Sequence, residues 1–329
     1  MLLKLVPDQT SIPFTNWRMI SAVLSTIAVA VSIFAVATMG LNFGVDFRGG
    51  VTIEVSDSEP ISVDAVRDAV TALNLGEVRV QEIQDFSGGA EGVVVFLEQQ
   101  VVADDASGAG PEEAKAAEQA QQRASEAVQG VLRELLGDGY QLRRADVVGP
   151  AVSGELINAG VTAVVIAIGL MLLYIWFRFE WQFSVGAIIA LVHDVLITLG
   201  MFALTRLEFS LAIIAAILTI VGYSMNDTVV VYDRVRENLR KYKKKPLAEL
   251  LNQSINDTLS RTVMTSVTTL LALVSLYVLG GEVLRGFTFA MIWGVLIGTY
   301  SSIFVAAPIL LAFGVKRDWS KQKVEAAPA

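Results

Sequence analysis

The chain has 329 residues, of which 53% are hydrophobic and 18% charged, and its mean hydropathy of +0.56 is too high for an ordinary soluble protein. Its net charge of −8 is concentrated between residues 41 and 150, which contain 20 Asp and Glu against 8 Lys and Arg, so the rest is net basic. The absence of cysteine excludes disulfides and Cys-based metal sites, and a lone histidine, His193, excludes a multi-histidine metal centre, so no cofactor is expected.

Apolar stretches of about 20 residues, the length that crosses a hydrocarbon core of about 30 Å, occur six times along the chain. The first contains an Ala35-x-Ala37 spacing typical of a signal-peptide cleavage site, but its apolar run is too long for a signal core, so we interpret it as an uncleaved helix. The sequence therefore predicts an α-helical polytopic membrane protein. The six stretches lie at 18–39, 156–177, 183–204, 209–232, 262–280 and 287–314.

Lys and Arg are distributed unequally among the connections between these stretches. One side holds both termini, Arg178 and seven basic residues between positions 234 and 245, whereas the other short connections hold only Arg206 and Arg285. Because cytoplasmic loops carry the excess of basic residues, we expect both termini in the cytoplasm and the acidic segment between the first two stretches on the other side of the membrane. The basic run is interpreted as a topology signal that also contacts membrane lipid, in preference to a nucleic-acid site.

The acidic segment between the first two stretches predicts a small exported domain. Apolar periodicity, capping residues and turn residues give the order strand, helix, strand, strand, helix, strand, which is typical of a ferredoxin-like α+β fold. A mobile loop is expected at 99–110. The predicted elements are a strand at 51–55, a helix between Ser62 and Gly76, strands at 77–84 and 92–98, a helix between Pro111 and Gly137, and a strand at 140–147.

These elements divide the chain into four parts. They are the cytoplasmic N-terminus with the first transmembrane helix at 1–40, the exported domain at 41–150, the five-helix remainder of the bundle at 151–315 with a basic cytoplasmic loop at 233–261, and a cytoplasmic tail at 316–329.

Charged residues inside apolar stretches point to a functional site, because each costs about 2.5–3.5 kcal/mol at a helix centre. Asp227, beside Asn226, lies on a polar face of the fourth stretch, and Arg261 begins a polar stripe at the fifth. Both fall in the cytoplasmic part of the bundle, so we expect them to be partners that load and unload a proton. A structural ion pair is the alternative. His193 and Asp194 in the third stretch form a relay or a buried hydrogen-bonded pair.

Small residues recur every fourth position of the sixth stretch, at Gly294, Gly298 and Ser302. This spacing predicts close packing of that helix against another one rather than a chemical role.

Several segments, in order over almost the whole chain, closely resemble the SecF family, the partner of SecD in the resistance-nodulation-division superfamily. The longest match is the run from Gly222, Tyr223 and Ser224 to Asn238. It contains Asp227, Asp233, Arg234, Arg236 and Glu237. The other matches are the run Gly44–Gly50 with Asp46, Gly49 and Gly50, and the segments Val148–Pro150, Phe177–Trp181, Ala190–Asp194 and Ser260–Thr262.

The resemblance implies a non-enzymatic subunit of the bacterial inner membrane. It would work with a SecD-like subunit, the SecYEG channel, and YajC and YidC, and use the proton gradient to draw preproteins outward. It assigns proton flow to Asp227 and Arg261 and leaves a further acidic residue to SecD. The acidic segment 99–119 departs from the family pattern.

Three other functions are disfavoured by the sequence. A proton-coupled small-solute exporter of the same superfamily would need larger exported domains than about 110 residues. An intramembrane aspartyl protease would need a second motif besides Tyr232-Asp233, and Asp233 is expected to neutralise Arg234 or Arg236 instead. ATP hydrolysis is disfavoured because no phosphate-binding loop motif occurs.

Overall fold

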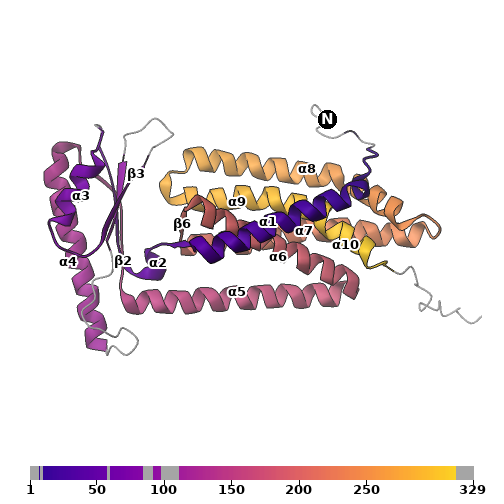
Figure 1. The fold of residues 1–329 in the computed structure, drawn as a ribbon, viewed down its shortest axis with the longest axis horizontal. Coiled ribbons are helices and arrows are strands. Elements are labelled where there is room, and N and C mark those ends of the chain that lie inside the picture. Colours follow the sequence, from indigo (N-terminus) through magenta and orange to yellow (C-terminus); the bar gives the residue numbers. More distant parts are fainter. Residues whose placement is uncertain (1–6, 8–9, 58–59, 84–91, 98–110, 316–329) are drawn as a thin grey trace, which may run out of the picture.

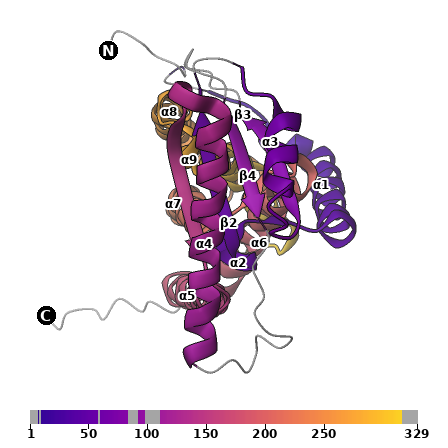
Figure 2. The ribbon, with the colours of Figure 1, turned by 90° about the vertical axis from the view of Figure 1, so that its left-hand side faces the viewer.

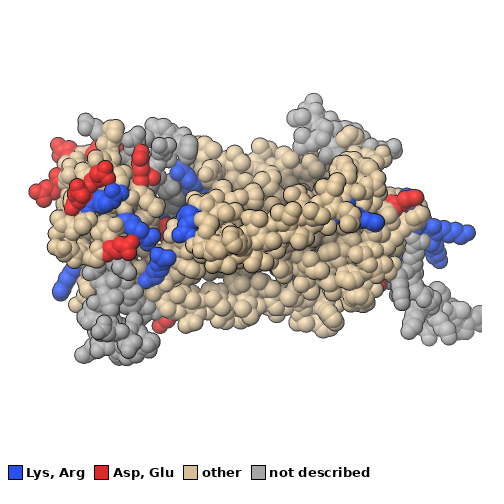
Figure 3. All heavy atoms as spheres, in the orientation of Figure 1, with Lys and Arg blue, Asp and Glu red and all other residues tan. Residues whose placement is uncertain are grey.

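The computed structural model describes residues 7, 10–57, 60–83, 92–97 and 111–315, which form a helical bundle with a small sheet domain at one end (Figure 1). Within these residues, six helices are long and apolar enough to cross a membrane. On the face shown in Figure 3, charged side chains gather over the sheet domain and at the opposite end of the bundle, and the surface between them is almost uncharged. The expected polytopic architecture is confirmed.

The bundle contains one long helix for each predicted apolar stretch. Helix α7 packs chiefly against the last helix and α8, and α6 packs against α1, whereas α5 runs along one side with none of its most apolar stretch buried. The helices are α1 (Arg18–Met39, preceded by the 3-10 turn η1, Phe14–Trp17), α5 (Pro150–Arg178), α6 (Trp181–Thr205), α7 (Leu211–Lys241), α8 (Leu247–Leu279), and a last helix built of α9 (Glu282–Ser301), the π-helical turn η3 (Ser302–Ala306) and α10 (Ala307–Ala312).

Two of the predicted helices are longer than expected, which corrects the loop at 233–261. Helix α7 continues to Lys241 and α8 already begins at Leu247, so only residues 242–246 connect them. Beyond the membrane stretch both helices keep an apolar stripe, in which Val235 and Leu239 of α7 belong to the same buried cluster as Leu250, Leu251 and Ile255 of α8. Burial of this stripe stabilises helix outside the apolar stretches that sequence reading detects.

The close approach predicted from the small residues of the last helix is confirmed. A Cβ added to Gly298 would lie 2.9 Å from the Ser224 Cβ of α7, and one added to Gly294 would collide with the Ile220 side chain. The two helices are therefore packed nearly backbone to backbone where the polar residues of α7 lie.

Replacing Gly298 by alanine is expected to destabilise the bundle by about 1–3 kcal/mol, because the added methyl group overpacks the contact with α7. Gly169→Ala in α5 is the matched control, since a Cβ there meets nothing within 4 Å. Thermal unfolding of the purified protein in detergent measures both. Equal melting temperatures for the two variants would contradict the packing described here.

The sheet domain has the predicted element order and the ferredoxin-like strand order β3-β4-β2-β5, with each neighbouring pair antiparallel. Its two helices cover the sheet face that points away from the bundle (Figure 2). The buried valines of β2 and β4 meet Val128 and Leu132 of the second helix in one apolar core. The elements are β2 (Gly50–Ser56), α3 (Val63–Thr71), β3 (Val78–Ile83), β4 (Gly92–Leu97), α4 (Pro111–Leu136) and β5 (Gln141–Val148).

The ends of α3 follow the sequence signals in part. Ser62 is its N-cap, with the side-chain oxygen accepting a hydrogen bond from the Ala65 N–H at 3.3 Å. The helix ends at Thr71, before the expected Gly76, because Asn74 adopts a left-handed conformation with φ of 51°. The loop expected at 99–110 lies outside the described residues.

A short junction joins the sheet domain to the start of α7. Strand β1 (Asn42–Phe43) pairs in parallel with β6 (Glu208–Phe209), and the single turn α2 (Val45–Arg48) follows β1. The Asp46 carboxylate accepts a hydrogen bond from the Leu211 N–H, the first residue of α7, at 2.9 Å. Gly49 and Gly50, with φ of 70° and 120°, then turn the chain into β2. This part of the family motif therefore has a structural role.

We expect Asp46→Ala to cost about 1 kcal/mol of stability. The change removes the side-chain acceptor of the Leu211 N–H, which has no partner within the helix, and a negative charge that suits the dipole of α7. Asp68→Ala is the control, because Asp68 is an exposed carboxylate in the interior of α3, away from the first turn of that helix. Thermal unfolding is again the measurement, and a loss no larger than that of the control would argue against the capping role.

Candidate functional site

The fourth-stretch carboxylate is enclosed between three helices. Asp227 lies on the face of α7 that packs against α8 and the last helix, and only 8% of it is exposed. The Thr262 hydroxyl of α8 donates to Asp227 Oδ1 at 2.6 Å, and the Ser302 hydroxyl of η3 donates to Oδ2 at 2.5 Å. Both carboxylate oxygens therefore have a hydroxyl partner, which lessens the cost of burying the charge at this depth.

Arg261 lies close to Asp227 without contacting it. Its side chain is exposed on the surface of α8, where it interacts electrostatically with Asp227, but no direct ion pair joins the two in the part of the chain that the structure describes. Arg261 directly precedes Thr262, which does contact the carboxylate. Any displacement of this turn of α8 therefore changes the hydrogen bond and the electric field at Asp227 together.

A second carboxylate is buried on the next helix. Asp194 of α6 has no exposed surface, and its Oδ1 is 2.8 Å from His193 Nδ1. Its Oδ2 accepts from the Ser224 hydroxyl of α7 at 2.5 Å and from the Ser301 hydroxyl of α9 at 2.7 Å. Both oxygens of Asp194 therefore have hydrogen-bond partners, as in a purely structural buried pair. Asp194 lies on α6, the helix that precedes the helix of Asp227.

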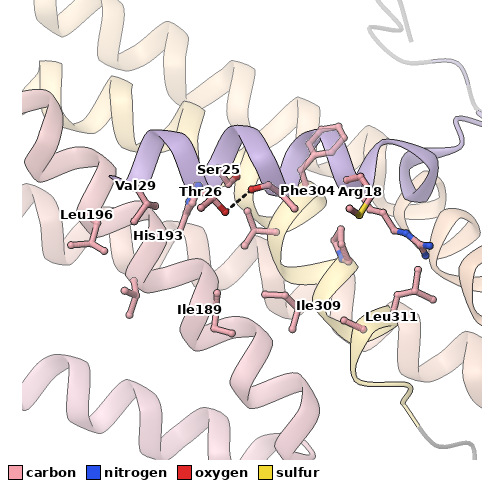
Figure 4. Close-up of a pocket in the computed structure, with 16 residues that line it drawn as sticks. Arg18, Ser25, Thr26, Val29, Ile189, His193, Leu196, Phe304, Ile309 and Leu311 are labelled. Carbon is pink, nitrogen blue, oxygen red and sulfur yellow. Dashed lines mark hydrogen bonds between the residues drawn. The ribbon is translucent and has the colours of Figure 1, made fainter. Parts of the chain in front are cut away.

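His193 contacts Asp194 and also lines a groove on the outside of the bundle. The groove lies between α1, α6 and the segment from η3 to α10, has a volume of about 750 Å³, and is lined mostly by apolar side chains, with Arg18 near one end (Figure 4). His193 is 5% exposed, and its Nε2 has no hydrogen-bond partner in the part of the chain that the structure describes. Among the described residues, no three His, Cys, Asp or Glu side chains are grouped as a metal site requires.

Other polar residues of the fourth stretch form a chain of hydroxyls or face outward. The Tyr223 hydroxyl donates to Ser266 of α8 at 3.3 Å, and Ser266 lies 2.7 Å from the Thr299 hydroxyl of α9. Asn226 is exposed, and a Cβ added to Gly222 would meet nothing within 4 Å. One side of α7 and α8 thus presents polar groups at membrane depth, although such groups are costly in contact with lipid.

The charged end of the motif forms ion pairs at the far end of α7. Asp233 pairs with Arg178 of α5 at 3.0 Å and lies 3.7 Å from Arg236, so the second of the two expected partners is confirmed. Arg234 instead pairs with Glu237 at 2.7 Å and Asp257 at 2.8 Å. A carboxylate held by two arginines is unsuited to share a proton with a second carboxylate, which counts against a protease dyad.

Sequence reasoning missed the hydroxyl partners of both carboxylates. It assigned Ser302 only to helix packing, treated Thr262 as part of a motif, and did not consider Ser301. The available signal was a pair of consecutive serines, Ser301 and Ser302, in an apolar stretch that passes Asp194 and Asp227.

Comparisons with known proteins agree with this arrangement. Residues 128–316 match the family model described as "Protein export membrane protein SecD/SecF, C-terminal", and residues 34–56 match the "SecD/SecF GG Motif". A protein translocase subunit SecF from Rhodobacter capsulatus is 45% identical over 97% of this chain and 94% of its own length.

Longer relatives contain a SecF-like part within one chain. The protein translocase subunit SecDF of Brucella abortus is 41% identical over 95% of this chain and 39% of its own length. The crystal structure of SecDF from Thermus thermophilus, described as a translocon-associated membrane protein, matches with a TM-score of 0.76 and 35% identity. That match covers 94% of this chain and 40% of the SecDF chain.

Proposed function

The chain belongs to the SecF family of protein-export membrane proteins, accessory subunits of the Sec translocase, and we propose that it uses the proton motive force to promote late steps of preprotein translocation. The observation that carries this proposal is Asp227, a buried carboxylate whose two oxygens are held by hydroxyls of two other helices. A proton gained or lost there changes contacts between α7, α8 and the last helix, so that proton binding is coupled to helix packing. Asp194, His193 and Asn226 are further proposed members of the relay.

The energy available from the gradient suits a repeated, small displacement. One proton that crosses the membrane yields about 2.3 kcal/mol per 100 mV. This biases a conformational equilibrium about 50-fold at 100 mV, since 1.4 kcal/mol corresponds to a factor of ten. The subunit therefore acts by cycles of movement, without a covalent reaction of its own, which is why we do not propose an enzyme.

A SecD-like subunit is the proposed direct partner. In the SecDF relatives a SecF-like part occupies about 40% of one longer chain, so the remainder lies beside it by covalent linkage. On this chain the outward polar face of α7 and α8, with Asn226, Arg261, Thr265 and Thr268 exposed, needs a cover other than lipid. We propose that SecD supplies this cover and the missing acidic residue.

The wider assembly follows from the same proposal. The sheet domain lies on the exported side of the inner membrane, both termini are cytoplasmic, and the complex works on preproteins that leave the SecYEG channel, with YajC and YidC as further partners. The basic residues at the end of the bundle opposite to the sheet domain support this orientation (Figure 3).

Site-specific cross-linking tests the partner directly, because the chain contains no cysteine. A single cysteine at Thr265 or Thr268, on the polar face of α8, is expected to cross-link to a SecD-like chain in native membranes. The matched control is Leu170→Cys on α5, which is 62% exposed and lies on the opposite side of the bundle (Figure 1). Cross-links from α8 only to further copies of this chain would instead favour a homo-oligomeric exporter.

A further inference from the structure

Two consecutive residues of the last helix contact the two carboxylates of the candidate site. Ser301 donates to Asp194 on α6, and Ser302 donates to Asp227 on α7, at 2.7 and 2.5 Å. Successive helical residues point about 100° apart, and α9 packs against both α6 and α7, so one turn of backbone reaches both acids. This turn is also where α9 changes into the π-helical turn η3.

Each serine hydroxyl has a second acceptor within reach. Ser301 Oγ is 3.2 Å from the carbonyl oxygen of Gly298, and Ser302 Oγ is 3.1 Å from that of Thr299. A hydroxyl carries one proton and can accept as well as donate, whereas an ionised carboxylate only accepts. When the carboxylate is ionised, the hydroxyl donates to it. When the carboxyl is protonated, the hydroxyl donates to the backbone carbonyl and accepts from the acid.

We propose that Ser301 and Ser302 are positioning residues that sense the protonation of Asp194 and Asp227 and couple the two sites through the turn at the start of η3. The use of this coupling in protein export rests on the proposed function, whereas the exchange of hydrogen bonds depends only on the residues of this chain. Reorientation of one hydroxyl changes the bonding of the carbonyl three residues before it, which belongs to the same turn as the other serine. Protonation of one acid thereby alters the donor available to the other.

The surroundings of the two acids contain few other titratable groups. Asp194 is faced by His193 on its own helix, and Tyr300 of α9 stacks on the His193 ring at 6.1 Å. Asp227 is faced by Arg261 of α8, and Tyr223 lies one turn away on α7. On α1, Ser25 bonds the Tyr300 hydroxyl at 3.1 Å, and Arg18 lies near one end of the groove that His193 lines.

The test is a pH titration of the carboxyl groups by infrared difference spectroscopy on the full-length protein in liposomes. Asp194→Asn and Asp227→Asn assign the two carboxyl bands. Ser302→Ala removes a donor from the ionised form of Asp227, so this carboxyl is expected to stay protonated to higher pH, by at least about tenfold in proton affinity. Ser302→Thr keeps a hydroxyl, so its Asp227 carboxyl is expected to titrate nearly as in the wild-type protein.

Coupling is measured with a double-mutant comparison. Asp194→Asn is expected to move the Asp227 titration in the wild-type background, and to move it clearly less when both serines are alanine, since only the direct effect of the lost charge then remains. Ser275→Ala is the matched control, because this exposed serine of α8 donates to the Leu271 carbonyl of its own helix. An Asp227 titration that Ser302→Ala leaves in place, or an Asp194 effect of equal size without the serines, overturns the proposal. Neither readout depends on export, so both remain informative if the proposed function fails.

Discussion

Asp227→Asn is expected to abolish the gradient-dependent stimulation of preprotein release while leaving the subunit inserted and bound to its partner. The asparagine oxygen accepts from Thr262 as the carboxylate does, and its amide group donates to Ser302, whose hydroxyl then turns to the Thr299 carbonyl. The three helices therefore keep their contacts, but the site no longer binds and releases a proton. The loss of stimulation is measured as the rate at which right-side-out membrane vesicles release a radiolabelled preprotein, with and without a proton gradient.

The control for this experiment is Asp64→Asn on the exposed surface of the sheet domain, which is expected to behave as wild type. Amounts of the variant in the membrane and of co-purified partner separate loss of function from loss of folding. If the Asp227→Asn protein still responds to the gradient at the wild-type rate, the hydroxyl-bound carboxylate is a structural feature and the proposed function is wrong.

The sequence predicted the architecture well because the signals of that architecture are local. Apolar stretches of membrane length, the Ser62 cap and alternating valines lie within a few residues of what they determine, and the six helices and the strand order agree with them. The helical ends of α7 and α8 were missed because their stability comes from contacts between Leu239 and its neighbours on the other helix, which no single stretch displays.

The site shows the same division between local and distant information. Asp227 and Asp194 stand out in the sequence, since a carboxylate in an apolar stretch is costly wherever it finally lies. Their partners Thr262, Ser301 and Ser302 are common residues of membrane helices. Only the packing of α8 against α7, and of the last helix against α6 and α7, makes them hydrogen-bond donors to these acids. The expected contact between Asp227 and Arg261 is replaced by an indirect link through the next residue, Thr262.

This indirect link gives the second large expected effect, which concerns Arg261. Arg261→Lys keeps the positive charge beside Asp227 but replaces a planar, weakly hydrated guanidinium by a compact, strongly hydrated ammonium group. Because Arg261 is exposed on the face that we assign to the partner, its fork of donors is available to a second carboxylate, and lysine offers no bidentate match. We expect gradient-dependent release to fall by about tenfold or more, as for the loss of one charge-assisted hydrogen bond.

Arg206→Lys is the matched control, since Arg206 lies at the sheet-domain end and donates to the carbonyl oxygens of Met39 and Gly40 at 2.7 and 3.1 Å. A lysine can replace such contacts with neutral acceptors, so this variant is expected to retain most of the activity. The rate of release is compared over a series of gradient strengths for both variants. Full activity of Arg261→Lys at every gradient would show that charge alone suffices at this position, and that the geometry of the guanidinium has no part in moving the proton.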